Sequence, residues 1–186
     1  MEERLQCKIA KNKHIRHLIA ELRKTPVYNL KTELPSKTFL DLLHSLFAGQ
    51  TQESAYFFTV DTNFRLLDLV FWNYGEKDHI LIDDYIWYIQ FTFFHERSKY
   101  IMLAHNHPSQ TSFPSKKDVI YSRSLFKKSL YARIRFIESF IVTEKTVTEI
   151  FNERIFQNGK LLSKENFANH YYSFFNFDFE LVYGLR

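Results

Sequence analysis

Apolar residues occur along the chain either at intervals of three and four or in short continuous runs, and the first pattern predicts helices. Between residues 15 and 22 they follow one another at intervals of three and four, which is typical of an amphipathic helix, and Pro26 ends it. The same spacing recurs in 39–47, where Ser36 is a suitable N-cap residue. Two further helices are expected at 83–96 and 118–130.

Shorter, continuous apolar runs predict strands, and their order along the chain predicts the fold class. Residues 54–60 and 65–72 flank the turn-forming Asp61-Thr62-Asn63 and should form a hairpin. Further strands are expected at 100–104, 133–142 and 147–151. This order of elements predicts an α/β protein with a mixed β-sheet flanked by helices. With helices on both faces, the 54–60 strand should be buried along its whole length.

Composition limits the class of protein further. The chain has 186 residues, 45% of them apolar, which suits one domain with a packed core. A single cysteine, Cys7, excludes an internal disulfide and a cysteine-based metal cage. No apolar stretch reaches the length that spans a bilayer, and the first residues lack a hydrophobic signal core. We therefore expect a cytoplasmic protein with no membrane partner.

The charge distribution leaves two interpretations open. The formal net charge is +4, and much of the positive excess lies near the N-terminus, on Lys8, Lys11, Lys13, Arg16, Arg23 and Lys24. Such a run is usually a solvated helix face. It also permits a weak association with nucleic acid.

The clearest chemical signal follows the strand expected at 100–104. His105 and His107 stand two residues apart, so in an extended segment their side chains point the same way. Asp118 comes at the first turn of the next predicted helix and can supply a carboxylate oxygen. Two imidazoles, one carboxylate and a water form a tetrahedral Zn2+ site with an open position, which is the catalytic rather than the structural arrangement.

Each part of this pattern also has a plainer interpretation. A His-x-His pair is common outside metal sites, and an Asp near a helix N-terminus is favoured as a cap. The joint pattern is what favours a metal site: His105-x-His107, then seven residues, then Ser115-x-x-Asp118.

This joint pattern matches the JAMM motif of JAB/MPN metalloproteases in every defined position. The flanking residues, Ala104-His105-Asn106-His107-Pro108-Ser109 and Pro114-Ser115, resemble the RadC family, once labelled DNA repair proteins. The resemblance runs from about Leu34 to Phe156, and it implies the JAB/MPN (cytidine deaminase-like) sandwich. It divides the chain into a basic extension (1–33), a RadC-like JAB/MPN domain (34–156) and an aromatic-rich tail (157–186). We expect the tail to pack on the domain or to form a homodimer interface.

The resemblance also implies roles for individual residues. Zn2+ would be bound by His105, His107 and Asp118, and Ser115 would donate a hydrogen bond to the developing oxyanion. The family uses a Glu eight residues before the Asp that ends the first strand, and Glu53 stands eight residues before Asp61. Glu53 would then be the general base and acid. Its alternative is an exposed residue in the polar loop that precedes the strand.

Some residues depart from the family pattern. Gln110 stands where RadC-like proteins usually have Gly, which predicts a different loop conformation or a narrower cleft. Glu138-Ser139 replaces an Asp-His pair of the family. These changes leave the metal ligands intact and alter their surroundings, so they bear on the class of substrate more than on metal binding.

Three functions are consistent with the sequence. The first is a JAMM-type zinc metallohydrolase that cleaves a peptide or isopeptide bond in a peptide or protein substrate. The second is a DNA-repair-associated or nucleic-acid-associated protein, for which the basic N-terminal segment is the main support. The third is an inactive JAB/MPN scaffold for protein interactions. Retention of every core motif position argues against the scaffold, and the absence of alternating aromatic and basic residues argues mildly against the second function.

Overall fold

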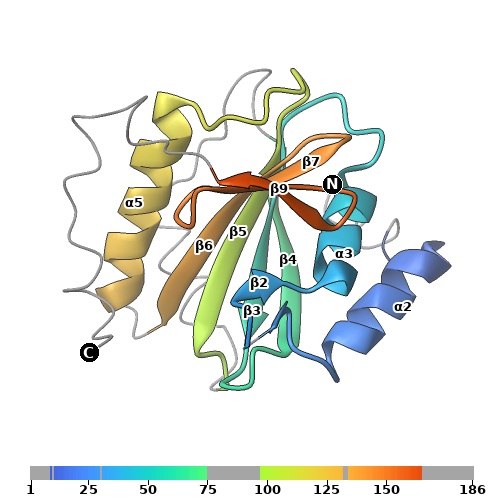
Figure 1. Ribbon diagram of the computed structural model, residues 1–186. Coiled ribbons are helices and arrows are strands. Elements are labelled where there is room, and N and C mark those ends of the chain that lie inside the picture. The colour runs from blue at the N-terminus through green and yellow to red at the C-terminus, as the bar shows by residue number, and fades with distance from the viewer. Residues whose placement is uncertain (1–8, 10, 30, 75–96, 132–133, 165–186) are drawn as a thin grey trace.

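A seven-stranded mixed sheet forms the centre of the protein in the computed structural model (Figure 1). The structure describes residues 9, 11–29, 31–74, 97–131 and 134–164, so the helix expected at 83–96 and most of the aromatic tail lie outside the described residues. The strands are β3 (Ser54–Val60), β4 (Leu66–Tyr74), β5 (Tyr100–Asn106), β6 (Arg135–Val142), β7 (Thr146–Glu149), β8 (Arg154–Gln157) and β9 (Lys160–Lys164).

The sheet has the order β4-β3-β5-β6-β7-β8-β9. Of its neighbouring pairs, β5 and β6 run parallel and the others antiparallel. The parallel pair is joined through α5 (Lys116–Tyr131), because two parallel strands need a crossover connection. The α/β fold with a mixed sheet, which was predicted from the sequence, is therefore confirmed. The crossover also brings the beginning of α5 toward the end of β5, where the histidines lie.

Helices cover both faces of this sheet. On one face lie α2 (Lys13–Leu22) and α3 (Lys37–Phe47), and on the other lies α5 (Figure 1). The α3 side has the larger core, in which Phe39 makes edge-to-face contacts with Phe58 and Phe140. On the α5 side, Leu125 packs in a cluster with Phe136. All seven residues of β3 are buried, as expected for a strand covered on both faces.

The helix boundaries follow from local signals in the sequence. The Oγ atom of Ser36 accepts a hydrogen bond from the backbone N–H of Phe39, so Ser36 is the N-cap residue of α3 as predicted. After α3 the chain turns at Gly49, which adopts a φ of 71°. Asn12 caps α2 in the same way by accepting from His14 and Ile15.

The structure contains strands that the sequence pattern did not predict. Strands β1 (Tyr28–Asn29) and β2 (Leu34–Pro35) form a separate two-stranded sheet. At the other end, β8 and β9 extend the main sheet past residue 156. No helix among the described residues is long and apolar enough to cross a membrane.

A buried group of charged residues connects the N-terminal segment to the last strands. The carboxylate of Glu149 accepts hydrogen bonds from the Tyr28 hydroxyl, at 2.6 Å, and from Nε of Arg154. A second carboxyl group, on Glu138, is fully buried, and this burial together with the nearby charge of Glu149 raises its pKa. Arg154 also donates to the backbone oxygen of Glu33 at 2.9 Å.

Candidate metal centre

The two histidines of the motif leave the sheet on the same side. His105 lies in β5 opposite Ala55 of β3, and its neighbours at alternate positions, Ile101 and Leu103, belong to the core on the α5 side. The alternation of side chains along a strand therefore directs His105 toward α5. His107 follows one residue after the strand, and its backbone N–H donates to the carbonyl of Val142 at 3.0 Å. Both side chains are buried.

Asp118 comes to the histidines from the first turn of α5. Ser115 and Asp118 cap this helix reciprocally: Asp118 Oδ2 accepts from the backbone N–H of Ser115 at 2.7 Å, and Ser115 Oγ accepts from the backbone N–H of Asp118 at 3.2 Å. The Ser-x-x-Asp half of the motif thus forms a cap and also fixes the carboxylate. In this contact the Ser115 hydroxyl is an acceptor, so its own hydrogen is left for another partner.

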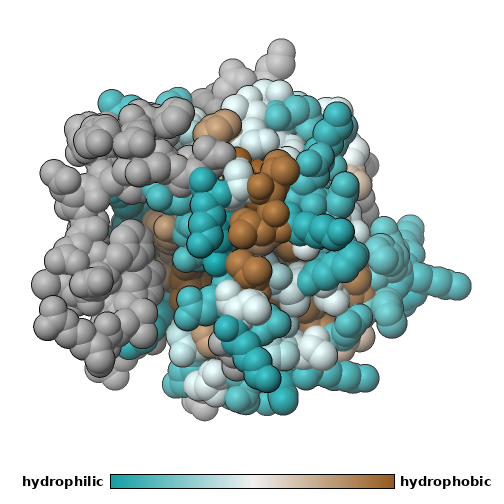
Figure 2. Space-filling model, viewed as in Figure 1, coloured by the Kyte–Doolittle hydropathy of each residue, from teal (hydrophilic) through white to brown (hydrophobic). Residues whose placement is uncertain are grey.

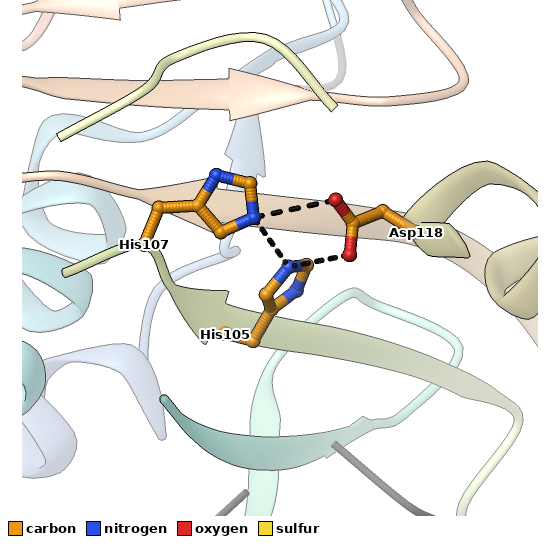
Figure 3. A group of neighbouring side chains, drawn as sticks. All are labelled: His105, His107 and Asp118. Carbon is orange, nitrogen blue, oxygen red and sulfur yellow. Dashed lines mark hydrogen bonds and ion pairs between the residues drawn. The ribbon is translucent and has the colours of Figure 1, made fainter. Parts of the chain in front are cut away.

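The three side chains converge on one point, as Figure 3 shows. His105 Nε2 lies 3.2 Å from His107 Nε2, and it lies 3.2 Å from Asp118 Oδ1. His107 Nε2 lies 3.3 Å from Asp118 Oδ2. Ligand atoms placed about 2.0–2.1 Å from a common ion in a tetrahedron are roughly 3.3 Å apart. The two imidazole nitrogens show this spacing, and each lies at it from one of the two Asp118 oxygens, so the group could hold a tetrahedral metal ion.

The electrostatics of the group favour a cation. Burial raises the pKa of Asp118, but the charges and hydrogen bonds of His105 and His107 outweigh it and hold that pKa well below its usual range. Burial lowers the pKa of His107, but the hydrogen bond and charge of Asp118, the Thr111 carbonyl and the charge of Glu53 together raise it. The surroundings therefore stabilise positive charge at His107 and negative charge at Asp118, as suits side chains that could hold a metal ion.

A backbone group orients His107. Its Nδ1 lies 2.8 Å from the carbonyl oxygen of Thr111. Because a carbonyl oxygen only accepts, Nδ1 carries the hydrogen, and Nε2 of the neutral ring faces the other ligands with its lone pair. Contacts of this kind, behind the ligand atom, fix the tautomer and the ring orientation in metal sites.

Asn106, between the two histidines, holds the segment that carries Glu53. Its Oδ1 accepts from the backbone N–H of Ser54 at 2.7 Å and from the Ser54 hydroxyl at 3.0 Å. Its Nδ2 donates to the carbonyl of Gln52 at 3.1 Å. The residues on both sides of Glu53 are thus fixed to the strand that ends in the ligands. Glu53 itself is half-buried, and its charge reaches His107.

The positions that depart from the family pattern can now be located. Gln110 has a φ of 63°, in the left-handed region that glycine adopts most easily. A glycine at this position could therefore adopt the same backbone conformation. What differs is the side chain, whose Oε1 accepts from the backbone N–H of Glu144 at 2.9 Å. Glu138 pairs with Met102, which packs on the α3 side of the sheet, so it belongs to the buried charged group rather than to the metal centre.

Comparison with protein families matches residues 34–155 to the RadC-like JAB domain. This match covers well over half of the chain, and the chain belongs to that family. A comparison with curated proteins gives no match.

Two features of the centre were missed by reasoning from the sequence. One is the Thr111 carbonyl behind His107, which no residue type can signal because every residue has a carbonyl. The other is the set of hydrogen bonds made by Asn106. Its position between two ligands in a strand was a usable signal, because side chains alternate and Asn106 must face away from the metal.

Proposed function

We propose that this protein is a zinc-dependent hydrolase of the JAMM type that cleaves a peptide or isopeptide bond. The observation that carries the proposal is the convergence of the three side chains on a scaffold of the RadC-like JAB family. The Nε2 atoms of His105 and His107 lie 3.2 Å apart, and each lies 3.2–3.3 Å from one of the two oxygens of Asp118. Three protein ligands leave a fourth tetrahedral position for water or substrate, which is typical of catalytic zinc.

When bound, zinc would lower the pKa of a water at the site and polarise the scissile carbonyl. The protein's own residues would do the rest. Glu53 would take a proton from water at its carboxylate and deliver it to the leaving amine. Ser115 would donate its hydroxyl hydrogen to the oxyanion that develops, while its Oγ still accepts from Asp118 N. Asn106 would keep the Glu53 segment in register with the ligands.

The first test is the metal content of the protein purified without added metal. We expect about one zinc per chain in the wild type and little in His105→Ala or Asp118→Ala, measured by elemental analysis. His44→Ala is the matched control, because His44 is a half-buried histidine on α3 outside the ligand group. Equal zinc in all four proteins would contradict the ligand assignment. Two imidazoles and a carboxylate accept other divalent ions as well, so competition with manganese and cobalt should accompany this measurement.

The second test is hydrolysis by the zinc-loaded protein. A screen of fluorogenic peptides and isopeptide-linked peptides should give at least one substrate whose cleavage a chelator abolishes. Loss of the same cleavage in Asp118→Ala would link it to this centre. Stoichiometric zinc without cleavage of any substrate would favour the interaction scaffold over the enzyme.

The exposed face of α2 supports a second candidate function, association with nucleic acid. Five exposed basic residues stand on or beside this helix, against the single acid Glu21: Lys11, Lys13, Arg16, Arg23 and Lys24. Their net charge of +4 equals that of the whole chain. Figure 2 shows hydrophilic side chains over this region, at the right of the view. The apolar face of α2 is buried on the domain, so what remains for a partner is charge.

A salt titration tests this candidate. We expect DNA oligonucleotides to bind with an affinity that falls steeply as salt is raised, because each neutralised phosphate releases counterions. Lys13→Ala/Arg16→Ala should reduce the salt slope by roughly two, since each lost contact removes about one unit. Lys145→Ala/Lys160→Ala removes two exposed lysines elsewhere and serves as the control. Equal binding by both double variants would exclude α2 as the contact surface.

A further inference from the structure

The segment between His107 and Ser115 is attached to the turn between β6 and β7 by two of its own side chains. Gln110 Oε1 accepts from the backbone N–H of Glu144 at 2.9 Å. Ser112 Oγ lies 2.8 Å from Thr146 Oγ1, a hydrogen bond in which either hydroxyl can donate. The two attachments stand two residues apart on the segment; one reaches the turn at Glu144, and the other reaches Thr146, the residue of β7 that follows the turn.

The β6–β7 turn is a firm anchor for these contacts. Thr143 Oγ1 accepts from the backbone N–H of Thr146 at 2.9 Å and lies 2.8 Å from Thr146 Oγ1. The backbone N–H of Thr143 donates to the carbonyl of Thr146 at 2.9 Å. Both threonines are buried, so the turn is held by its own side chains and by the two strands that it joins.

The residue between the two attachments is Thr111, whose carbonyl oxygen lies 2.8 Å from Nδ1 of His107. Gln110 and Ser112 therefore fix the peptide group that orients a metal ligand. Gln110 does so at a φ of 63°, a conformation unfavourable for a residue with a side chain. In this conformation Gln110 makes a side-chain hydrogen bond to the backbone of Glu144, which a glycine at the same position could not make.

We propose that Gln110 and Ser112 are positioning residues: they tie the Thr111 carbonyl to the β6–β7 turn and thereby hold His107 in the orientation that binds the metal. This proposal rests on metal binding by the ligand group, as proposed above. Gln110, which stands where the family usually has Gly, would then contribute to metal affinity. The metal centre would also include contacts to a turn about 25 residues beyond Asp118.

The alternative is that both hydrogen bonds only stabilise the fold, and the test separates metal affinity from stability. Zinc affinity is measured by competition with a chromophoric chelator, and the thermal midpoint is measured on the metal-free protein. Gln110→Asn keeps a side chain that tolerates a positive φ but is too short to reach Glu144. Ser112→Ala removes the second attachment. Thr38→Val is the control, because Thr38 makes a similar contact, 3.0 Å to Glu21, between α3 and α2.

We expect Gln110→Asn and Ser112→Ala each to weaken zinc binding by up to about tenfold, the low end of the range for losing an outer partner of a metal ligand. The double variant should lose more. Thr146→Ser, which keeps the hydroxyl, should bind zinc like the wild type. Thr38→Val should lower the thermal midpoint with no change in zinc affinity. With cobalt in place of zinc, the visible absorption of the two loop variants should also change, because the imidazole geometry changes.

The outcomes distinguish this inference from the proposed function. Zinc binding by the wild type, with unchanged affinity and an unchanged cobalt spectrum in both loop variants, would overturn the positioning role alone. A fall in affinity in Thr38→Val as large as in the loop variants would also overturn it, since loss of stability would then explain the effect. No zinc binding by the wild type would overturn the proposed function, and this inference with it.

Discussion

At the scale of single residues, the centre combines ligands that the motif defines with supports that only the structure reveals. Asp118 is a ligand candidate and a helix cap at once, because its Oδ2 accepts from Ser115 N while facing His107. A residue with two roles is costly to replace. The three-residue separation of Ser115 and Asp118 is that of a reciprocal cap.

The first prediction concerns Glu53. Glu53→Gln should leave zinc content unchanged, because the three ligands and the cap of α5 are untouched. Any hydrolysis should fall about 10²–10⁴-fold, which is the contribution of a general base. Metal analysis and peptidase kinetics on the same preparation measure both quantities. A variant with full activity would reduce Glu53 to a residue of the polar loop.

The second prediction concerns Asn106. Asn106→Ala removes three hydrogen bonds and leaves the buried backbone N–H of Ser54 without its acceptor. We expect the free energy of unfolding of the metal-free protein to fall by about 1–3 kcal/mol, the cost of an unsatisfied buried polar group. Asn63→Ala, at an exposed asparagine in the β3–β4 turn, should change it by less than about 0.5 kcal/mol. Equal unfolding curves for the two variants in urea would show that the Asn106 contacts contribute no stability.

At the scale of elements, the sequence predicted those whose signals are local. The hairpin of β3 and β4 follows from two apolar runs around Asp61-Thr62-Asn63, and the bounds of β3 agree with the prediction. The hairpin of β8 and β9 was missed although its turn, Asn158-Gly159, carries a usable signal. Both residues have positive φ, at 51° and 73°, which is the pattern of a tight two-residue hairpin turn. Strand β9 is exposed and has the sequence Lys-Leu-Leu-Ser-Lys. Apolar and polar residues do not alternate in it, so the sequence pattern did not predict a strand there.

The candidate site divides in the same way. His105, His107 and Asp118 could be predicted because a metal needs particular residue types at particular spacings. The attachment of Gln110 to Glu144 could not, because it joins a loop to a turn through a backbone N–H, which no residue type marks. The charged group of Glu138, Glu149 and Arg154 was missed as well. Its members stand on three strands, and only the sheet order brings them together.

The third prediction concerns this charged group, which connects β6, β7 and β8. Burial and the charge of Glu149 raise the pKa of Glu138 from 4.5 to about 8, against the hydrogen bonds from Phe151, Ser139 and Asn152. A carboxyl whose pKa is higher in the folded state binds more protons there than in the unfolded state. Its contribution to stability is therefore complete below about pH 4.5 and is lost as the pH rises through about 8.

The free energy of unfolding should accordingly fall between these pH values, by up to about 1.4 kcal/mol per pH unit for one proton. Urea titrations of the metal-free protein at several pH values measure this slope. Glu138→Gln should reduce the slope whatever it does to absolute stability, because it removes one of the two carboxyls whose pKa burial raises, the other being Glu149. Asp41→Asn, at a half-buried acid of α3 that pairs with Lys37 outside this group, is the control. Parallel pH profiles for Glu138→Gln and the wild type would refute this interpretation.

At the scale of the whole molecule, the two candidate functional regions lie on opposite faces of the sheet. The metal centre lies at the end of β5 under the beginning of α5, whereas α2 and α3 cover the opposite face. The basic surface of α2 is therefore carried by the face that does not hold the ligands. Under both proposals, substitutions on the exposed face of α2 would change the affinity for a polyanion and leave the three candidate ligands in place.

The fourth prediction tests how firmly α2 belongs to the fold, since the family match begins only at residue 34. Leu22 is 0% exposed and lies in the same core as Leu43 of α3. Leu22→Ala should lower the free energy of unfolding by about 2–5 kcal/mol, the usual cost of a cavity in a packed core. Arg16→Ala, on the exposed face of the same helix, should change it by less than about 0.5 kcal/mol. Urea unfolding of the metal-free proteins measures both.

Zinc affinity completes this test, because the sheet separates α2 from the ligands. We expect Leu22→Ala to bind zinc as tightly as the wild type under conditions in which both are folded. A destabilised variant with unchanged zinc affinity would show that the N-terminal helix supports the domain without shaping its metal centre. A negligible loss of stability would mean that α2 packs only loosely, and that residues 34–164 carry the stable core by themselves.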